Sequence, residues 1–410
     1  MSITRRVFLR NSALAVVGTA ALPAFLHRAA FGAEQSVKTK RLVVIFQRGA
    51  ADGLNIVVPH AEQAYYAMRP SINIPRSSVL DLDGFFGLHP AMEGFQPLWK
   101  QRHLAIVHAA GSPDPTRSHF DAQDFMESGT PGIKVTSDGW LNRALRGTPD
   151  SRDTAFRAIA LGPSLPRILS GSEPAVALNN ISDFGVGGKN SAPIANTFEA
   201  MYDQSADAVL HGTGTETFEA VKMLKSADPA KYKPSPGADY PRGRFGDSLK
   251  QLCQLIKANL GVQVAFADIG GWDHHVNEGN TQGQIANVLR EFSQSISAFW
   301  IDLGDLAEDT VVITMSEFGR TARENGNRGT DHGHANVMFV MGGPVKGGKV
   351  YGRWPGLEQS QLYEGRDLAV TTDFRRVLGE AVSRHLGNQS LEQVFPGYEA
   401  RPGDFLRYLG

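Results

Sequence analysis

The sequence predicts an α/β protein in which a mainly parallel sheet carries helices on both faces. Short apolar segments rich in β-branched residues alternate with segments of helical periodicity through most of the chain. The apolar segments show little polar alternation, which is typical of strands that are buried on both faces. Clusters of ionisable residues recur just after these segments, at the edge where parallel-sheet proteins place their ligand sites.

The expected strands are apolar runs bounded by glycine or by polar loops. In chain order they are residues 41–47, 104–111, 155–162, 174–178, 262–271, 310–316 and 337–343. The expected helices carry apolar residues on one side, and they are residues 89–101, 118–128, 284–303 and 372–387. Two or three further helices are expected between 195 and 260, with a Pro/Gly-rich break at 233–243. Ser118 would cap the second helix, and a glycine would end the last one.

Composition limits the class of protein. The chain has 410 residues, a formal net charge of -1 and one cysteine, Cys253. A near-neutral chain without a basic patch does not indicate nucleic-acid binding. A single cysteine excludes an internal disulfide framework and a metal site made of several cysteines.

The first 33 residues are typical of an export signal. Arg5 and Arg6 lie in "TRRVFLR", which resembles the twin-arginine signal, and an apolar stretch over 13–26 precedes small residues near Ala33. We therefore expect a signal over 1–33 and a single domain over 34–410, located in the periplasm or secreted. A retained membrane anchor is the alternative. No second long apolar run follows, so no membrane span is expected in the mature protein.

Four strand ends supply residues that could carry chemistry. Their side chains are carboxylates, imidazoles and a helix-capping hydroxyl, of the kinds that bind divalent cations such as Zn²⁺, Mn²⁺ or Ca²⁺. In chain order they are Asp52, Ser118, His119, Asp273, His274, His275, Glu317, Arg320, Asp331, His332 and His334. Because these ends meet at one edge of a parallel sheet, the sequence predicts a shared metal site.

Each of these residues has an alternative role. Asp52 could be a turn residue, and Ser118 could be only a helix cap. Asp273 and the two histidines after it could lie in a solvated loop, as could His332 and His334. Two adjacent histidines do not easily bind one metal, so one of them is expected to be structural. Arg320 could simply pair with Glu317.

Several segments together resemble a known bacterial family. They are "RGAADGLNIVVP", "RSHFDAQDFMESGTPG", "GGWDHHVNEG", "SEFGRT", "DHGHANVMFVMGGPVKGGKVYG" and "TTDFRRVLGE". The chain is similar over its expected mature length to the twin-arginine-exported domain-of-unknown-function family 1501. That family is similar in fold to the alkaline phosphatases and sulfatases, so the resemblance implies an alkaline phosphatase-like three-layer sandwich.

The resemblance also implies roles for individual residues. Asp52 would be the metal ligand after the first strand, and Ser118, in "PTRSH", would be the nucleophile. Asp273 and His275 would form the first ligand pair, and His332 or His334 the last ligand. Where the superfamily carries Asp-His, however, this chain has Glu317-Phe318. Phe318 cannot bind a metal, so a second cation would lack a ligand unless Asp331 or His119 supplies one.

These observations favour a metal-dependent hydrolase of small anionic phosphate or sulfate esters. Ser118 would attack, Arg320 would bind the oxyanion, and the ligands would be Asp52, Asp273, His275, Glu317, Asp331 and His332. The alternative is a non-catalytic binding or assembly protein that contacts an exported partner protein through a degenerate metal site. A dinucleotide-dependent oxidoreductase is not indicated, because no G-x-G-x-x-G follows the first strand.

Overall fold

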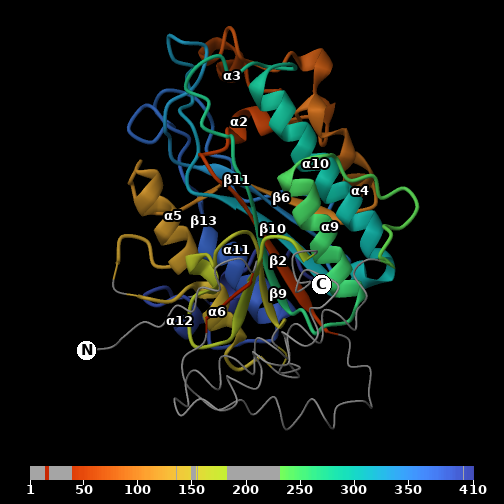
Figure 1. Cartoon of the computed structure of the whole chain (residues 1–410). Coiled ribbons are helices and arrows are strands. Elements are labelled where there is room, and N and C mark those ends of the chain that lie inside the picture. The colour runs from red at the N-terminus through yellow and green to blue at the C-terminus, as the bar shows by residue number, and fades with distance from the viewer. Residues whose placement is uncertain are drawn as a thin grey trace, which may run out of the picture.

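The structure is a computed structural model, and it describes residues 14–17 (backbone), 39–134, 136–148, 154, 156–181, 231–399 and 401–410. Its main feature is a ten-stranded sheet (Figure 1). From one edge to the other the order is β1 (Leu14–Val17), β8 (Ala175–Leu178), β7 (Ala158–Leu161), β9 (Val264–Ile269), β2 (Arg41–Gln47), β10 (Thr310–Ser316), β11 (Asn336–Gly342), β6 (Leu104–Gly111) and β12 (Lys349–Tyr351). The tenth strand, β13 (Thr372–Asp373), pairs with the end of β6.

Most strand pairs in this sheet are parallel. The exceptions are β1, which is antiparallel to β8, and β11, which is antiparallel to both β10 and β6. A separate small sheet has the order β3 (Val57–Val58), β5 (Gly87–Leu88) and β4 (Leu80–Asp81). The predicted α/β class with a mainly parallel sheet is therefore confirmed.

Helices cover both faces of the sheet and make three layers (Figure 1). One face packs against η2 (Pro90–Phe95), α4 (Gln96–Lys100), α9 (Arg244–Lys257) and α10 (Gln284–Leu303). The other packs against α5 (His119–Ser128), α6 (Trp140–Leu145), α11 (Phe374–Glu380), the π-turn η7 (Ala381–His385) and α12 (Leu391–Val394). Along β2, Val43 and Ile45 belong to the first core, whereas Leu42, Val44 and Phe46 belong to the second. This two-sided burial explains why the strand is apolar throughout.

The sequence located the main elements well. The predicted strands 41–47, 104–111 and 310–316 match β2, β6 and β10, and the predicted helix 284–303 matches α10. The helix expected over 89–101 is instead the 3-10 helix η2, whose backbone kinks at Met92, followed directly by α4. Most of the expected export signal and part of the helical region after 195 lie outside the described residues. Among the described helices, none is long and apolar enough to cross a membrane.

Strand register brings the candidate residues to one edge of the sheet. Gln47, the last residue of β2, pairs with Ile269 of β9 and with Ser316 of β10. The chain therefore leaves these three parallel strands at the same level. Because β11 is antiparallel, the loop that precedes it arrives at this edge too.

Candidate metal centre

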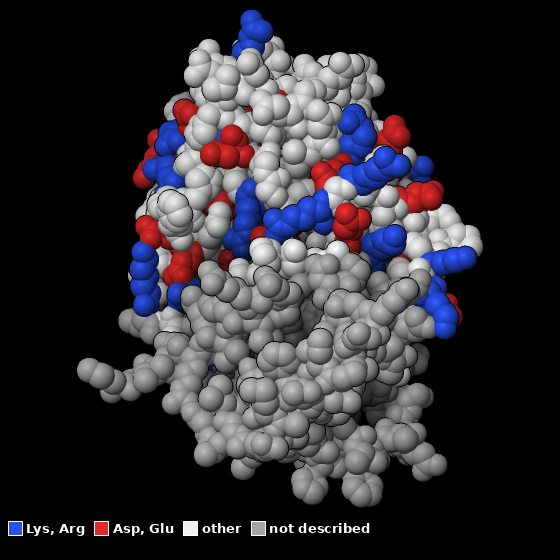
Figure 2. All heavy atoms as spheres, in the orientation of Figure 1, with Lys and Arg blue, Asp and Glu red and all other residues white. Residues whose placement is uncertain are grey.

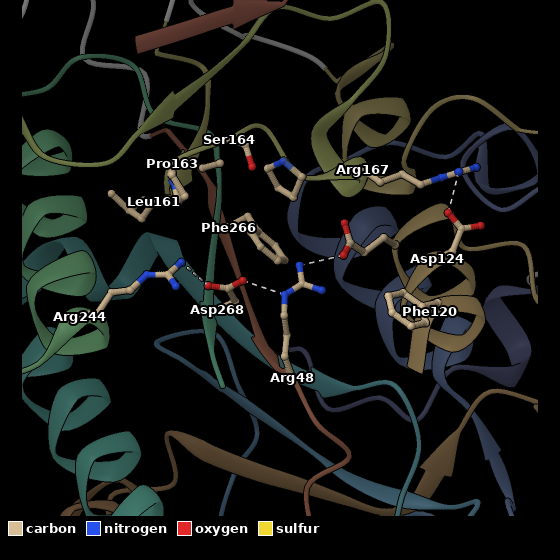
Figure 3. A pocket seen from close by; sticks show the side chains of 14 residues that line it. Arg48, Phe120, Asp124, Leu161, Pro163, Ser164, Arg167, Arg244, Phe266 and Asp268 are labelled. Carbon is tan, nitrogen blue, oxygen red and sulfur yellow. Dashed lines mark hydrogen bonds and ion pairs between the residues drawn. The ribbon is translucent and has the colours of Figure 1, made fainter. Parts of the chain in front are cut away.

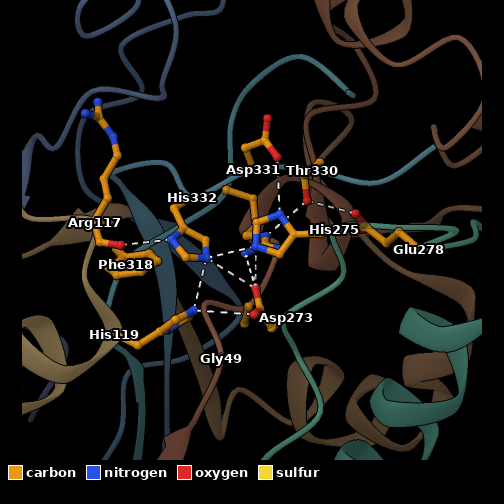
Figure 4. A network of polar contacts seen from close by, with 12 residues as sticks. Gly49, Arg117, His119, Asp273, His275, Glu278, Phe318, Thr330, Asp331 and His332 are labelled. Carbon is orange, nitrogen blue, oxygen red and sulfur yellow. Dashed lines mark hydrogen bonds and ion pairs between the residues drawn. The ribbon is translucent and has the colours of Figure 1, made fainter. Parts of the chain in front are cut away.

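Three imidazoles and one carboxylate converge at this edge (Figure 4). The Nε2 atom of His332 lies 3.0 Å from Nε2 of His119 and 3.0 Å from Nε2 of His275. Asp273 completes the group: its Oδ1 lies 3.0 Å from His275 Nε2 and 3.3 Å from His332 Nε2, and its Oδ2 lies 3.6 Å from His119 Nε2. We call His119, Asp273, His275 and His332 the histidine cluster.

The other ring nitrogen of each histidine has an oxygen partner. His119 Nδ1 lies 2.8 Å from a carboxylate oxygen of Glu317, and His275 Nδ1 lies 3.2 Å from one of Asp331. His332 Nδ1 lies 2.8 Å from the carbonyl oxygen of Arg117. A carbonyl or ionised carboxylate only accepts, so these Nδ1 atoms carry protons and, in the neutral rings, leave the Nε2 lone pairs facing the cluster.

This arrangement fits a bound cation. The single lone pair of His332 Nε2 can accept only one N–H well, yet the Nε2 atoms of two other histidines both lie 3.0 Å from it. A cation shared by these nitrogens would explain their close approach. Metal-binding histidines usually donate their second ring N–H to a carboxylate or a backbone carbonyl, as all three do here. Ligand atoms that share one Zn²⁺ at ~2.0–2.2 Å stand roughly 3.3–3.6 Å apart in a tetrahedron. The two Nε2 atoms of His119 and His332 are 3.0 Å apart, and Asp273 approaches them with Oδ1 at 3.3 Å from His332 and Oδ2 at 3.6 Å from His119, so the ligand atoms of these three residues lie within 4.8 Å of one another.

The pKa shifts of the cluster residues also suit the binding of a cation. The hydrogen bond with Glu317 raises the pKa of His119, which makes its imidazole more basic. Burial lowers the pKa of His332, which keeps that ring neutral. Burial would raise the pKa of Asp273, but the hydrogen bond and charge of Arg320 lower it, so the carboxylate stays ionised.

Glu317 is held behind His119 by several donors. It is buried, and one carboxylate oxygen accepts from the Gly49 N–H at 2.9 Å and from the Gln123 amide at 2.9 Å, besides its contact with His119. Its other oxygen accepts from the Ser316 hydroxyl at 3.0 Å. Burial would raise the pKa of Glu317, and these hydrogen bonds lower it. Glu317, which the sequence suggested as a direct ligand, thus contacts His119 Nδ1 on the side of the ring away from the Nε2 atoms of the cluster.

The loops that carry the cluster are held close together by glycines. Gly49 has φ +117°, and a Cβ there would lie 3.0 Å from the backbone nitrogen of Asp273. At Gly329 a Cβ would lie 2.4 Å from the backbone of His275, so the loop after β10 could not pack there with a larger residue. These close approaches place Glu317 and His275 from different strand ends around one point.

Phe318 is part of the support for the cluster. Its buried ring lies with its centroid 5.0 Å from those of both His119 and His332. The position where the sequence resemblance implied a second metal ligand therefore holds an aromatic ring that packs on two imidazoles. The sequence did not indicate this role.

Two of the predicted site residues are placed elsewhere. Asp52 is buried and forms an ion pair with both terminal nitrogens of Arg69. Burial would raise the pKa of Asp52, but Arg69 holds it low, while burial and the Asp52 charge raise the pKa of Glu278 well above its usual range. Asp331 reaches the cluster only through His275, and its side chain is half exposed.

Arg320 and Ser118 lie next to the cluster. Arg320 is buried and donates to Asp273 at 2.8 Å and to the Thr330 hydroxyl at 3.1 Å. Ser118 caps α5, where its hydroxyl oxygen accepts from the Asp121 N–H at 3.5 Å, and it directly precedes His119. The cap that the sequence predicted is therefore present.

The remaining histidines of these loops, His274 and His334, are not part of the cluster. His274 is buried, and burial lowers its pKa. His334 contacts the carbonyl oxygen of Ser112 at 3.1 Å and packs on Tyr363. Between the adjacent pair, His275 is thus the residue that joins the cluster. His119 belongs to the cluster but was not in the ligand set predicted from the sequence. Its position directly after Ser118, at one of the four strand ends, was the available signal.

Comparisons with known proteins bear on family and fold. The family described as "Protein of unknown function (DUF1501)" matches residues 39–394. No curated protein matches the chain at a significant level. Among solved structures, the chain is similar to a sulfatase, PsFucS1, from Pseudoalteromonas sp., with 11% identity, coverage of 88% of this chain and 71% of that one, and a TM-score of 0.40.

Two further solved structures are similar at the same level. One is the phosphonate monoester hydrolase of Agrobacterium radiobacter, with 9% identity, 88% and 79% coverage and a TM-score of 0.38. The other is the C-terminal periplasmic domain of EcEptC from Escherichia coli in complex with Zn, with 7% identity, 75% and 74% coverage and a TM-score of 0.35. Since these TM-scores are below 0.5, what this chain does must be inferred from its own side chains.

Proposed function

This chain belongs to the DUF1501 family, and from the geometry of its histidine cluster we propose that it is a metal-dependent hydrolase of phosphate or sulfate esters. The observation that supports this most is the convergence of three imidazole nitrogens and the Asp273 carboxylate, with every Nδ1 held by an oxygen acceptor. The cluster is also open to solvent, since the Asp273 and His275 side chains are 45% and 41% exposed. A substrate can therefore reach it.

The donor set favours a transition metal. Ca²⁺ takes six to eight oxygen ligands, whereas three imidazoles with one carboxylate suit Zn²⁺ or a related divalent ion. When bound, such an ion polarises an ester and lowers the pKa of a neighbouring hydroxyl or water. We assign His119, Asp273 and His332 as its ligands, because their ligand atoms all lie within 4.8 Å of one another, and we propose His275 as a fourth through its 3.0 Å contacts with His332 and Asp273. Glu317, Asp331 and the Arg117 carbonyl hold the rings, and Arg320 holds Asp273.

Ser118 is the proposed nucleophile. It is partly exposed at the start of α5, directly before the ligand His119, and its capping contact of 3.5 Å is long. The hydroxyl thus keeps its own proton and can turn toward the cluster. Attack by Ser118 Oγ on phosphorus or sulfur would expel the alcohol, which takes up the serine proton. Water would then hydrolyse the serine ester.

A non-catalytic binding role is the second candidate, and Phe318 is the observation that favours it. Its ring fills the place where the sequence resemblance implies a second ligand, so we propose that the site binds one cation and not two. Such a protein would bind an anionic group or an exported partner without turnover. In both cases we propose that the signal expected over 1–33 directs the folded protein to the periplasm or outside the cell.

The test combines metal analysis with activity on p-nitrophenyl phosphate, p-nitrophenyl sulfate and a p-nitrophenyl phosphodiester. We expect about one bound metal per chain, loss of that metal in His119→Ala, and its retention in His334→Gln, the matched histidine outside the cluster. Ser118→Ala should keep the metal and lower kcat by on the order of a thousandfold or more.

Absence of bound metal from the wild type would overturn the hydrolase proposal. Metal without turnover on any of the three esters would favour the binding role. Turnover that Ser118→Ala leaves unchanged would exclude Ser118 as the nucleophile.

A further inference from the structure

A cavity of about 410 Å³ opens outside the histidine cluster, and Figure 3 shows the side chains that line it. Its walls come from the loop after β7, from β9, from Arg48 just after β2, and from α5. That volume is within the usual range for small-molecule sites. It lies at the same edge of the sheet as the cluster, because β2, β7 and β9 are parallel neighbours.

The cavity is physically linked to the cluster. Helix α5 begins with the cluster residue His119, and its next residue, Phe120, lines the cavity. Arg48 donates to the Gln123 side chain at 2.9 Å, and Gln123 in turn donates to Glu317 at 2.9 Å. A molecule bound in the cavity would therefore lie one short hydrogen-bonded chain away from the proposed metal ligands.

The charges around the cavity are balanced. Arg48 forms ion pairs with Glu127 at 2.8 Å and with Asp268 at 2.7 Å, and Asp268 also pairs with Arg244 at 2.9 Å. On the other side, Arg167 pairs with Asp124 at 2.6 Å. Three guanidinium groups thus face three carboxylates, so the cavity has no net charge with which to bind an anion or a cation. All three nitrogens of Arg48 already donate within this network, but each carboxylate oxygen can accept further hydrogen bonds, which are what the hydroxyl groups of a polyol can donate.

One wall carries an unusually exposed aromatic ring. Phe120 is 90% exposed, the most exposed large hydrophobic side chain among the residues that the structure describes. It lies at the mouth of the cavity opposite Arg244, with Arg48 between them (Figure 3). An exposed apolar surface beside a polar cavity indicates a binding site, and the face of a ring can pack against the C–H face of a saturated ring.

We propose that this cavity binds an uncharged sugar or a similar cyclic polyol. The hydroxyl groups would contact the Arg–carboxylate pairs, and one face of the ring would pack on Phe120. If the cavity binds the sugar part of a substrate, that substrate would be a phosphate or sulfate ester of a carbohydrate. This conclusion about the substrate rests on the proposed hydrolase activity. The sugar itself would bind whether or not the cluster holds a metal, since none of its contacts is a metal ligand.

The experiment is saturation-transfer NMR on the full chain with the methyl glycosides of glucose, galactose, mannose, fucose and N-acetylglucosamine. We expect at least one glycoside to bind, with and without prior EDTA treatment. Phe120→Ala should weaken that binding roughly three- to tenfold, and Phe120→Trp should retain it. Arg244→Gln, at an exposed member of the pairs, should also weaken it. Ile301→Ala, which removes another exposed apolar side chain, should not.

Some outcomes would overturn the proposal on its own. They are the absence of binding for all five glycosides, unchanged binding in Phe120→Ala, or binding of inorganic phosphate or sulfate in the cavity in preference to every glycoside. Loss of metal binding or of ester hydrolysis would instead overturn the proposed function, because glycoside binding is measured without either.

Discussion

At the scale of single residues, Phe318 and Glu317 show what sequence patterns can predict about this site. The pattern predicted that the chain delivers polar groups to the edge of the sheet just after β10, and it does. The pattern did not show whether the Glu317 carboxylate faces a cation or hydrogen-bonds to a histidine, because a carboxylate in either role would occupy the same position in the sequence. Nor could it show that Phe318 packs on two imidazoles contributed by distant loops.

The role of Glu317 leads to a prediction about metal affinity. Glu317→Gln preserves the shape of the side chain but removes the charge that raises the pKa of His119, a proposed metal ligand. We expect Zn²⁺ to bind about 10- to 100-fold more weakly, as is usual when such a supporting carboxylate is lost. Competition with a chromophoric chelator measures this directly.

Asp331→Asn is the matched control for that measurement. It removes the carboxylate behind His275, but the Asp331 side chain is 56% exposed and its charge is screened by water. The loss of affinity should therefore be smaller than in Glu317→Gln. Equal affinities for wild type and Glu317→Gln would show that Glu317 does not support a metal ligand.

At the scale of elements, α10 illustrates how a helix predicted from sequence acquires a role that the sequence does not show. Its bounds match the prediction, and its apolar side packs on the sheet. Near its end, however, the buried Asp302 accepts hydrogen bonds from the Tyr232 and Tyr240 hydroxyls, from the backbone N–H of Ser235 and from Lys257. The segment 233–243, predicted only as a break, is thereby fixed to two helices.

Asp302 should contribute measurably to stability. Asp302→Asn leaves Lys257 without its buried counter-charge, so we expect a loss of about 2 kcal/mol in the free energy of unfolding. Urea denaturation followed by circular dichroism measures it. Asp309→Asn is the control: it breaks the ion pair with the half-exposed Lys40 and should cost under about 0.5 kcal/mol. If the two variants lose the same free energy of unfolding, the hydrogen bonds to buried Asp302 stabilise the fold no more than a surface ion pair does.

At the scale of the whole molecule, the strand–helix alternation was sufficient to predict the sheet and its functional edge. Most sheet contacts join neighbouring parallel strands, whose apolar runs are readable in the sequence. The antiparallel direction of β11 was not predicted, because strand direction depends on the path of the connecting loop. On the face shown in Figure 2, acidic and basic side chains are intermixed over the described part of the chain.

The whole molecule should also lose stability in mild acid, through histidines outside the metal centre. Burial lowers the pKa values of His89, His108 and His385 to about 4 each. An unfolded histidine titrates near 6.5, so between about pH 6.5 and pH 4 the unfolded chain binds protons that the folded chain does not. Stability is therefore full above about pH 6.5 and is lost as the pH falls toward 4, with each histidine costing on the order of 2 kcal/mol between pH 7 and pH 5.

Thermal denaturation of EDTA-treated protein at pH 7, 6 and 5 measures this acid sensitivity without a contribution from bound metal. In His385→Gln the amide can still donate to the Arg41 carbonyl, which His385 contacts at 2.9 Å. The three histidines together should lower the stability between pH 7 and pH 5, and this variant should remove about one third of that loss, because it removes one of the three titrating rings. A melting temperature that is constant from pH 7 to pH 5, or an equally steep decline in His385→Gln, would show that these buried rings do not control the acid sensitivity of the fold.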